Sequence, residues 1–201
     1  MKLAVIGATR GIGLALVEAA LADGNEVTAL VRQPASMPLR HPELRIVQGS
    51  AEDAKSVADV VAGQDVVFNT LGTRNVTREV RLFSRSAEIL ADVLKPDQLL
   101  IAITGIGTGD STGDGGFLYD RVFMPLVLRR MYADKDRQEQ IIKSRVARWI
   151  IVRPGFLSNG PRTGRARAVT DLRGVKANRI SRADVADFLL AQAKSPDFIG
   201  Q

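Results

Sequence analysis

The loop Gly7-Ala8-Thr9-Arg10-Gly11-Ile12-Gly13 constrains the fold of this chain more than any other feature of its sequence. Residues 2–6, just before it, are apolar after Lys2, as expected for a β-strand that is buried on both faces. Residues 12–22 predict a helix, which Asp23-Gly24-Asn25 would end, and residues 26–31 predict a second strand. A glycine-rich turn in this position is typical of a βαβ unit in a parallel sheet.

The glycines of the loop indicate a phosphate-binding turn. The first N–H groups of a helix have no partner inside the helix and, together with the helix dipole, they attract an anion. A phosphate can approach them only where side chains are absent, which explains Gly7, Gly11 and Gly13. An ordinary strand-to-helix turn is the alternative, but the flanking strand and helix favour a dinucleotide whose pyrophosphate binds the loop.

The end of the second predicted strand indicates which dinucleotide is preferred. An Asp or Glu at that point would bind both ribose hydroxyls and repel a 2′-phosphate, whereas an Arg does the reverse. The sequence there is Leu30-Val31-Arg32-Gln33-Pro34, without a carboxylate, and Arg10 adds a second cation. Because guanidinium binds phosphate through paired hydrogen bonds, we expect NADP(H) to be preferred over NAD(H).

The remainder of the chain continues to alternate strands and helices. Further strands are predicted at 44–47, 65–69, 99–103 and 149–152, and helices at 52–62, 79–94, 119–132, 134–144 and 181–193. Two weaker strand signals lie at 166–170 and 198–200. The pattern predicts an α/β fold of the doubly wound Rossmann type, with a mostly parallel sheet and helices on both faces. We expect a single domain over residues 1–201, with a small substrate-side region formed by about 105–132 and 154–180.

Composition excludes several classes of site. The chain has no cysteine, and His41 is its only histidine, so neither a metal site nor a histidine-based catalytic triad is expected. The formal net charge is +6, but only 5% of the residues are aromatic, which argues against nucleic acid as a partner. No apolar run is long enough to cross a membrane and no signal peptide is recognisable, so we expect a cytoplasmic monomer or small homo-oligomer.

Six segments carry a resemblance to a known family. They are the glycine loop, Val31-Arg32, Val61-Ala62-Gly63-Gln64-Asp65-Val66-Val67, Leu71-Gly72-Thr73-Arg74, Tyr132-Ala133-Asp134-Lys135 and Val152-Arg153-Pro154-Gly155. Together they resemble the atypical short-chain dehydrogenases, in particular the NAD(P)H-binding, NmrA-like proteins of the flavin reductase and biliverdin-IXβ reductase branch. The resemblance extends from Met1 to about Gly200.

The resemblance implies where the cofactor would bind. It assigns the pyrophosphate to Gly7, Thr9, Arg10, Gly11, Ile12 and Gly13, the 2′-phosphate to Arg32, and the adenine to Gly49 and Ser50. It assigns the ribose and phosphates to Leu71, Gly72, Thr73 and Arg74, and the nicotinamide to Thr104, Gly105 and Ile106, covered by Pro154, Gly155 and Phe156. It also implies that Lys135 lies near the ribose and nicotinamide, which makes Lys135 and Thr104 the candidate catalytic residues.

The sequence departs from the family pattern in ways that concern the chemistry. Arg10 stands where the atypical family usually has glycine, Ser50 where relatives commonly have Asp, and Gly105 where some have serine. The Tyr-x-x-x-Lys pair of the better-known short-chain dehydrogenases is missing, because Phe123 lies four residues after Tyr119 and Asp136 four residues after Tyr132. Carbonyl reduction by a tyrosine acid is therefore not expected, and Lys135 has an alternative interpretation as a surface lysine in the charged run 134–137.

Two functions follow from these patterns. The first is an NADPH-dependent oxidoreductase that transfers a hydride to a flat, conjugated acceptor such as a flavin or quinone, because such an acceptor mainly needs positioning over the nicotinamide. The second is a non-catalytic NADP(H) sensor that binds a protein partner, which the missing Tyr/Lys pair and the Gly-rich segment 105–116 would fit. A sugar-nucleotide epimerase is disfavoured because that chemistry normally needs the same tyrosine.

Overall fold

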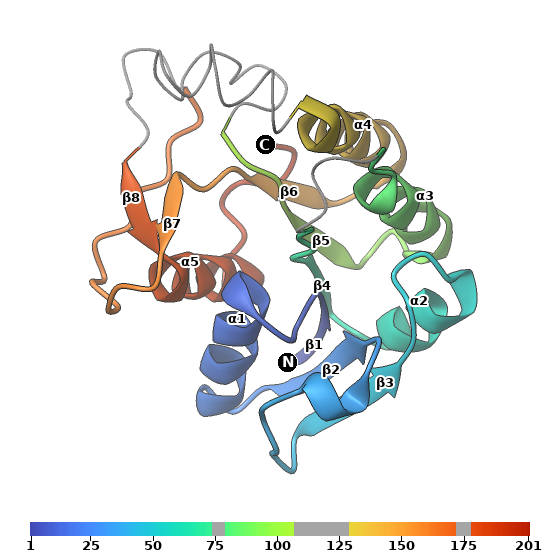
Figure 1. Ribbon diagram of the computed structural model, residues 1–201, viewed down its shortest axis with the longest axis horizontal. Coiled ribbons are helices and arrows are strands. Elements are labelled where there is room, and N and C mark those ends of the chain that lie inside the picture. Colours follow the sequence, from blue (N-terminus) through green and yellow to red (C-terminus); the bar gives the residue numbers. More distant parts are fainter. Residues whose placement is uncertain (74–78, 107–128, 172–177) are drawn as a thin grey trace.

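The computed structural model describes residues 1–73, 79–106, 129–171 and 178–201 (Figure 1). Its strands are β1 (Lys2–Ile6), β2 (Glu26–Val31), β3 (Leu44–Gln48), β4 (Val66–Asn69), β5 (Leu99–Ile103), β6 (Trp149–Val152), β7 (Phe156–Ser158) and β8 (Arg179–Ser181). Its helices are α1 (Gly11–Ala22), α2 (Ala54–Val61), α3 (Leu82–Val93), α4 (Arg129–Arg145) and α5 (Arg182–Lys194), with a 3₁₀ turn at Pro34–Ser36.

Six of the strands form one parallel sheet in the order β3-β2-β1-β4-β5-β6, and the predicted doubly wound Rossmann fold is thereby confirmed. Ile6 at the end of β1 lies opposite Leu30 of β2 on one side and Asn69 of β4 on the other. The loops that follow these three strands therefore begin side by side, at the point where the order of the strands reverses. In open α/β sheets, ligands bind in the crevice beyond this point.

Helices cover both faces of the sheet, and α1 and α5 lie together on one of them (Figure 1). Leu3 and Val5 of β1 belong to the core on the α1 and α5 face, whereas Ala4 and Ile6 belong to the core beneath α2, α3 and α4. In a strand that is buried on both faces, every position favours an apolar side chain. This explains why the first strand is a continuous apolar run rather than an alternating one.

Two segments differ from the sequence prediction. Residues 166–170 are not a strand; they are exposed and run in an irregular conformation over a cavity beside β6. Residues 198–200 form a turn instead of a strand, because the Gln201 N–H donates to Phe198 O and closes the chain on itself. The last two residues hydrogen-bond to β6, through Gly200 N to Trp149 O and through Ile151 N to Gln201 O.

The C-terminal half also holds a small sheet that the sequence did not predict. Strands β7 and β8 pair in parallel, with Phe156 opposite Arg179 and Ser158 opposite Ser181. Helix α4 is continuous from Arg129 to Arg145, so the predicted break near residue 133 is wrong, whereas the predicted helical residues 119–128 lie outside the described part. The short strands place the first turn of α5 beside the first turn of α1, which matters for the site below.

Candidate functional site

The residues predicted to bind a cofactor follow the carboxyl ends of the six strands of the main sheet. Residues 7–13 follow β1, Arg32 follows β2, and Gly49 and Ser50 follow β3. On the other half of the sheet, β4 is followed by Leu71, Gly72 and Thr73, β5 by Thr104, Gly105 and Ile106, and β6 by Pro154 and Gly155. Because all six strands are parallel, these residues share one edge of the sheet. Phe156 is the first residue of β7, and Arg74 lies outside the described residues.

Gly7 and Gly13 allow α1 to begin close to the sheet. A Cβ atom added to Gly7 would lie 2.8 Å from Thr70 O, and one added to Gly13 would lie 2.3 Å from Gly7 O and 2.5 Å from Thr70 Oγ1. Thr70 is in turn held by a hydrogen bond from its hydroxyl to Ile6 O, at 2.9 Å. Sequence reasoning missed Thr70, although its position directly after β4, next to the predicted Leu71, could have indicated it.

Gly11 leaves space open rather than filling it. Its φ is +63°, and among the described residues only one atom, Arg182 Nε at 3.8 Å, lies within 4 Å of the position that its Cβ would take. Arg10 precedes the helix in an extended conformation and its side chain makes no capping hydrogen bond. The first N–H groups of α1 thus face an open space without a side-chain cap, as expected where an anion binds.

The two arginines predicted to bind a 2′-phosphate are both exposed. The side chains of Arg10 and Arg32 have no hydrogen bond or ion pair with another of the described residues. They follow adjacent strands, β1 and β2, so two uncompensated positive charges lie at the same edge.

Gly49 and Ser50, the residues predicted to lie by the adenine, follow β3. Gly49 packs against α2, where its Cβ would lie 2.2 Å from Ser56 Oγ. The Ser50 hydroxyl accepts a hydrogen bond from Glu52 N at 3.2 Å.

Lys135 is directed from α4 toward the end of β5. Its Nζ donates to Thr104 O at 2.5 Å and lies 5.3 Å from the centre of the Phe83 ring. Burial lowers the pKa of Lys135 to about 8, with the Glu139 carboxylate acting in the opposite direction. A lysine that is still mainly protonated at neutral pH, yet more acidic than usual, can donate a proton or stabilise a developing negative charge.

Tyr132 lies on the same face of α4 as Lys135. A Cβ added to Gly105 would lie 3.3 Å from the Tyr132 hydroxyl and 3.8 Å from Lys135 Nζ. Residues three apart on a helix share a face, so the pair approaches one point even though the four-residue spacing is absent. The three-residue spacing of Tyr132 and Lys135 is the signal in the sequence that could have indicated this arrangement.

The charged run 134–137 on α4 is only partly solvated. Asp134 is fully buried and accepts hydrogen bonds from Phe83 N at 2.9 Å and from the Ser84 hydroxyl at 2.5 Å, thereby capping α3. Its ion pair with Arg137, at 3.1 Å, supplies the compensating charge. Anchored in this way, Asp134 sets the rotation of α4 and so directs its neighbour Lys135 toward β5.

A second buried carboxylate ties α4 to the ends of β5 and β6. Glu139 accepts from the Thr104 hydroxyl at 2.7 Å and from Arg153 Nε at 3.0 Å and Nη2 at 2.5 Å. The side chains of Glu139 and Arg153 are only 3% and 16% exposed. Arg153 was not a predicted site residue, although it follows a predicted strand and belongs to the segment Val152-Arg153-Pro154-Gly155 that carries the family resemblance.

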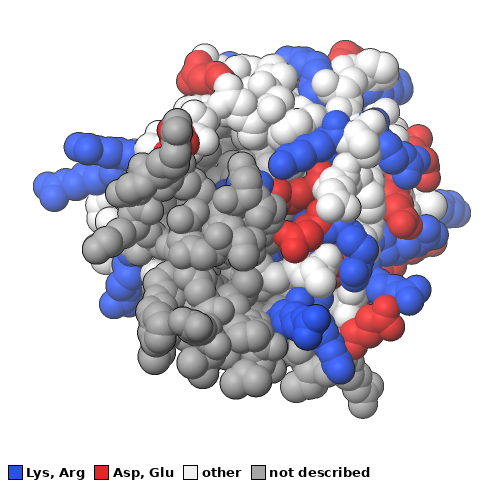
Figure 2. Space-filling view, turned by 90° about the horizontal axis from the view of Figure 1, so that it is seen from above, with Lys and Arg blue, Asp and Glu red and all other residues white. Residues whose placement is uncertain are grey.

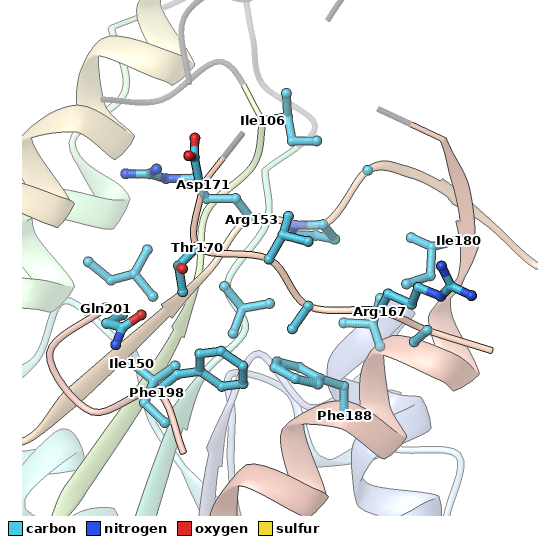
Figure 3. A pocket seen from close by; sticks show the side chains of 18 of the residues that line it. Ile106, Ile150, Arg153, Arg167, Thr170, Asp171, Ile180, Phe188, Phe198 and Gln201 are labelled. Carbon is cyan, nitrogen blue, oxygen red and sulfur yellow. The ribbon is translucent and has the colours of Figure 1, made fainter. Parts of the chain in front are cut away.

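A cavity of about 1110 Å³ lies beside β6, between the sheet, α5 and residues 166–171 (Figure 3). Its rim at the carboxyl edge contains Ile106, Pro154 and Gly155. Toward its floor, Phe188 of α5 lies close to Phe198, with the ring centres 5.9 Å apart. The cavity therefore joins an aromatic floor to the rim where the nicotinamide end of a cofactor is predicted.

Surface charge is mixed on the face in Figure 2, where the described basic side chains on one flank are interspersed with acidic ones. Among the described helices, none is both long and apolar enough to span a bilayer.

The fold and the open glycine turn define the class of protein as a dinucleotide-binding Rossmann domain. The chain belongs to the NAD(P)H-binding family, whose sequence profile matches residues 7–196. It is also 34% identical over 94 residues to a 3-beta-hydroxysteroid dehydrogenase of Mycolicibacterium neoaurum, a match that covers 44% of this chain and 25% of that protein. The aligned part is thus about a quarter of that curated relative.

Two solved structures are similar over nearly the whole chain. ChuY, an anaerobilin reductase from Escherichia coli O157:H7, is 22% identical with a TM-score of 0.79, over 98% of this chain and 92% of that one. SP1627 from Streptococcus pneumoniae, a proposed NADH-flavin reductase, is 24% identical with a TM-score of 0.77, over 100% and 96% of the two chains. At these identities the likeness establishes the fold, and it agrees with the resemblance to the atypical short-chain dehydrogenases.

Proposed function

We propose that this protein is an NADPH-dependent reductase that transfers a hydride to a flat, conjugated acceptor such as a flavin or quinone. The observation that carries the proposal is the joint placement of the open turn at Gly11 and the Lys135–Thr104 contact at one edge of the sheet. A dinucleotide bound along that edge would have its pyrophosphate at the Gly11 turn and its nicotinamide beside the Lys135–Thr104 contact.

The glycine loop would hold the pyrophosphate through backbone N–H groups, with Thr9 and Ile12 completing the turn. Arg32 and Arg10 would bind the 2′-phosphate, because both are exposed cations without a partner among the described residues. On the nicotinamide side, the contacts predicted from Leu71 to Arg74, from Thr104 to Ile106 and from Pro154 to Phe156 remain part of this proposal.

The bound cofactor supplies the hydride, and this chain supplies charge and position. Negative charge that develops on the reduced acceptor would be met by the ammonium group of Lys135, whose proton can also be transferred. Thr104 acts as a positioning residue: its carbonyl fixes Lys135 Nζ, and its hydroxyl is held by Glu139. Tyr132 brings a second hydroxyl toward the same point beside Gly105.

The acceptor would enter at the rim formed by Ile106, Pro154 and Gly155 and extend over the cavity beside β6. A mostly apolar cavity with two phenylalanines at its floor suits a planar, conjugated molecule better than a sugar. One of the structural neighbours is named as a proposed NADH-flavin reductase, which agrees with this class of acceptor.

The direct test is oxidation of NADPH, followed by its absorbance, with riboflavin, FMN and a soluble quinone each added in turn. Acceptor-dependent oxidation by the wild type, and its loss in Lys135→Met, is the expected result. Tight NADPH binding without turnover of any acceptor would contradict the reductase and favour the sensor, which should then retain a protein partner in only one cofactor state.

A further inference from the structure

Arg182, the first residue of α5, reaches the open side of the glycine turn although it lies far from that turn in the sequence. Its Nε is the atom that lies 3.8 Å from the Cβ position of Gly11. Figure 1 shows α5 beside α1, on the same face of the sheet. The space that Gly11 leaves open is thus bordered by a guanidinium group.

The backbone that carries Arg182 is firmly held. Ser181 caps α5, with Asp184 N donating to the Ser181 hydroxyl at 3.0 Å. Asp184 also accepts from Thr163 N at 2.7 Å and Gly164 N at 2.9 Å, which fastens the loop after β7 to the same helix turn. The backbone position of Arg182 is therefore set by hydrogen bonds of its buried neighbours Ser181 and Asp184.

The guanidinium of Arg182 is oriented but its charge is not neutralised. Nη1 donates to the side-chain oxygen of Asn159 at 2.6 Å, a neutral acceptor, and within the described part of the chain Arg182 has no ion pair. Arginine has five N–H donors, so most of them stay available for a ligand.

Arg182 also lies near other positive groups. The N-terminus of α1 carries partial positive charge and Arg10 adds a full one, whereas at α5 the carboxylate of Asp184 lies in the first helical turn. An anion between Arg182 and the first turn of α1 would be attracted by the guanidinium group and by the N–H groups of that turn.

We propose that Arg182 binds the pyrophosphate of the dinucleotide from the side opposite the glycine loop, so that Asn159 and α5 form part of the cofactor site. The inference rests on the proposed function insofar as it needs a dinucleotide in that site. It separates two roles for arginine: Arg182 acts on the group that NADPH and NADH share, whereas Arg32 acts on the 2′-phosphate that only NADPH carries.

The test compares NADPH and NADH affinities, measured by fluorescence titration, in the wild type, Arg182→Ala and Arg32→Ala. Loss of a charge-assisted phosphate contact weakens binding by about tenfold or more. We expect Arg182→Ala to lose this factor for both cofactors and Arg32→Ala to lose it for NADPH alone. Arg162→Ala is the matched control, since Arg162 pairs with Asp187 of the same helix at 2.8 Å and should leave both affinities unchanged.

The outcomes distinguish the inference from the proposed function. If the wild type binds neither cofactor, the proposed function fails. If the wild type binds both and Arg182→Ala stays within about twofold of it, the inference about Arg182 is overturned. Should Arg182→Ala unfold, Arg182→Lys and Asn159→Ala take its place. Both variants keep a cation on α5, but neither keeps a guanidinium group oriented by Asn159. Unchanged affinity for both cofactors in these variants also overturns the inference.

Discussion

Replacing Gly11 by alanine should separate cofactor binding from folding. The added methyl group would meet no described atom closer than 3.8 Å, so it creates no clash in the protein alone. The φ of +63° costs an alanine about 1 kcal/mol, which corresponds to a decrease of about 2–4 °C in Tm for a domain of this size. The free protein should therefore stay folded.

The same methyl group would occupy the space through which the pyrophosphate reaches the N–H groups of α1. Because those contacts need a close approach, we expect NADPH to bind Gly11→Ala about 100-fold more weakly, equivalent to about 2.8 kcal/mol. Isothermal titration calorimetry gives the affinity, and thermal unfolding of the free protein gives the stability.

Gly63→Ala provides the matched control. Gly63 has a φ of +69° and no atom within 4 Å of its Cβ position, and it lies between α2 and β4, outside the candidate site. It should lose a similar amount of stability and bind NADPH as the wild type does. A folded Gly11→Ala protein with wild-type affinity for NADPH would refute the assignment of the pyrophosphate to this turn.

Three further predictions concern single side chains. Arg32→Ala should weaken NADPH binding by about 2 kcal/mol and leave NADH binding and Tm unchanged; equal loss for both cofactors would exclude the 2′-phosphate contact. The rate of hydride transfer, measured by stopped flow, should fall as pH rises through about 8, because Lys135 loses its proton there. The variant Lys135→Gln should lower kcat about 100-fold and show no change of rate across this pH range. Burial alone would raise the pKa of Asp184, but hydrogen bonds from Thr163, Gly164 and Ser181 lower it to about 2. The stability that comes from this lowered pKa is present above pH 3.8 and is lost as pH falls through 2. In urea unfolding, Asp184→Asn should therefore lower the free energy of unfolding by about 3 kcal/mol at about pH 7 and by much less near pH 2. The same loss of stability at both pH values would contradict this prediction.

Much of the fold could be predicted from local patterns. The strands at 2–6, 26–31, 99–103 and 149–152 have the bounds that the sequence predicted, because each is a short apolar run that ends at a clear break. The segment 166–170 was predicted wrongly, since periodicity alone does not reveal whether a strand partner exists. Strands β7 and β8 were missed because each is only three residues long and is stabilised by a partner about twenty residues away.

Some residues of the candidate site could be predicted from local sequence and others could not. The order of the glycine loop, Arg32 and the residues after each strand could be predicted, because a parallel sheet brings the carboxyl ends of its strands to one edge. Arg153 and Arg182 could not, because their partners Glu139 and Gly11 are distant in sequence. The buried state of Asp134 was hidden for the same reason, as its partners lie on α3, about fifty residues away.

The sequence by itself determined a Rossmann fold with a glycine-rich turn after the first strand, because turn glycines and strand composition act locally; it also predicted that this turn and two arginines bind the phosphates of NADP(H). Only the tertiary structure decided that Tyr132 and Lys135 meet at Gly105 and that Arg182 borders Gly11. The physical reason is that side-chain direction on a helix depends on how that helix is rotated and packed. For α4 and α5 this rotation is set by buried carboxylates, Asp134 and Asp184, whose partners come from other parts of the chain.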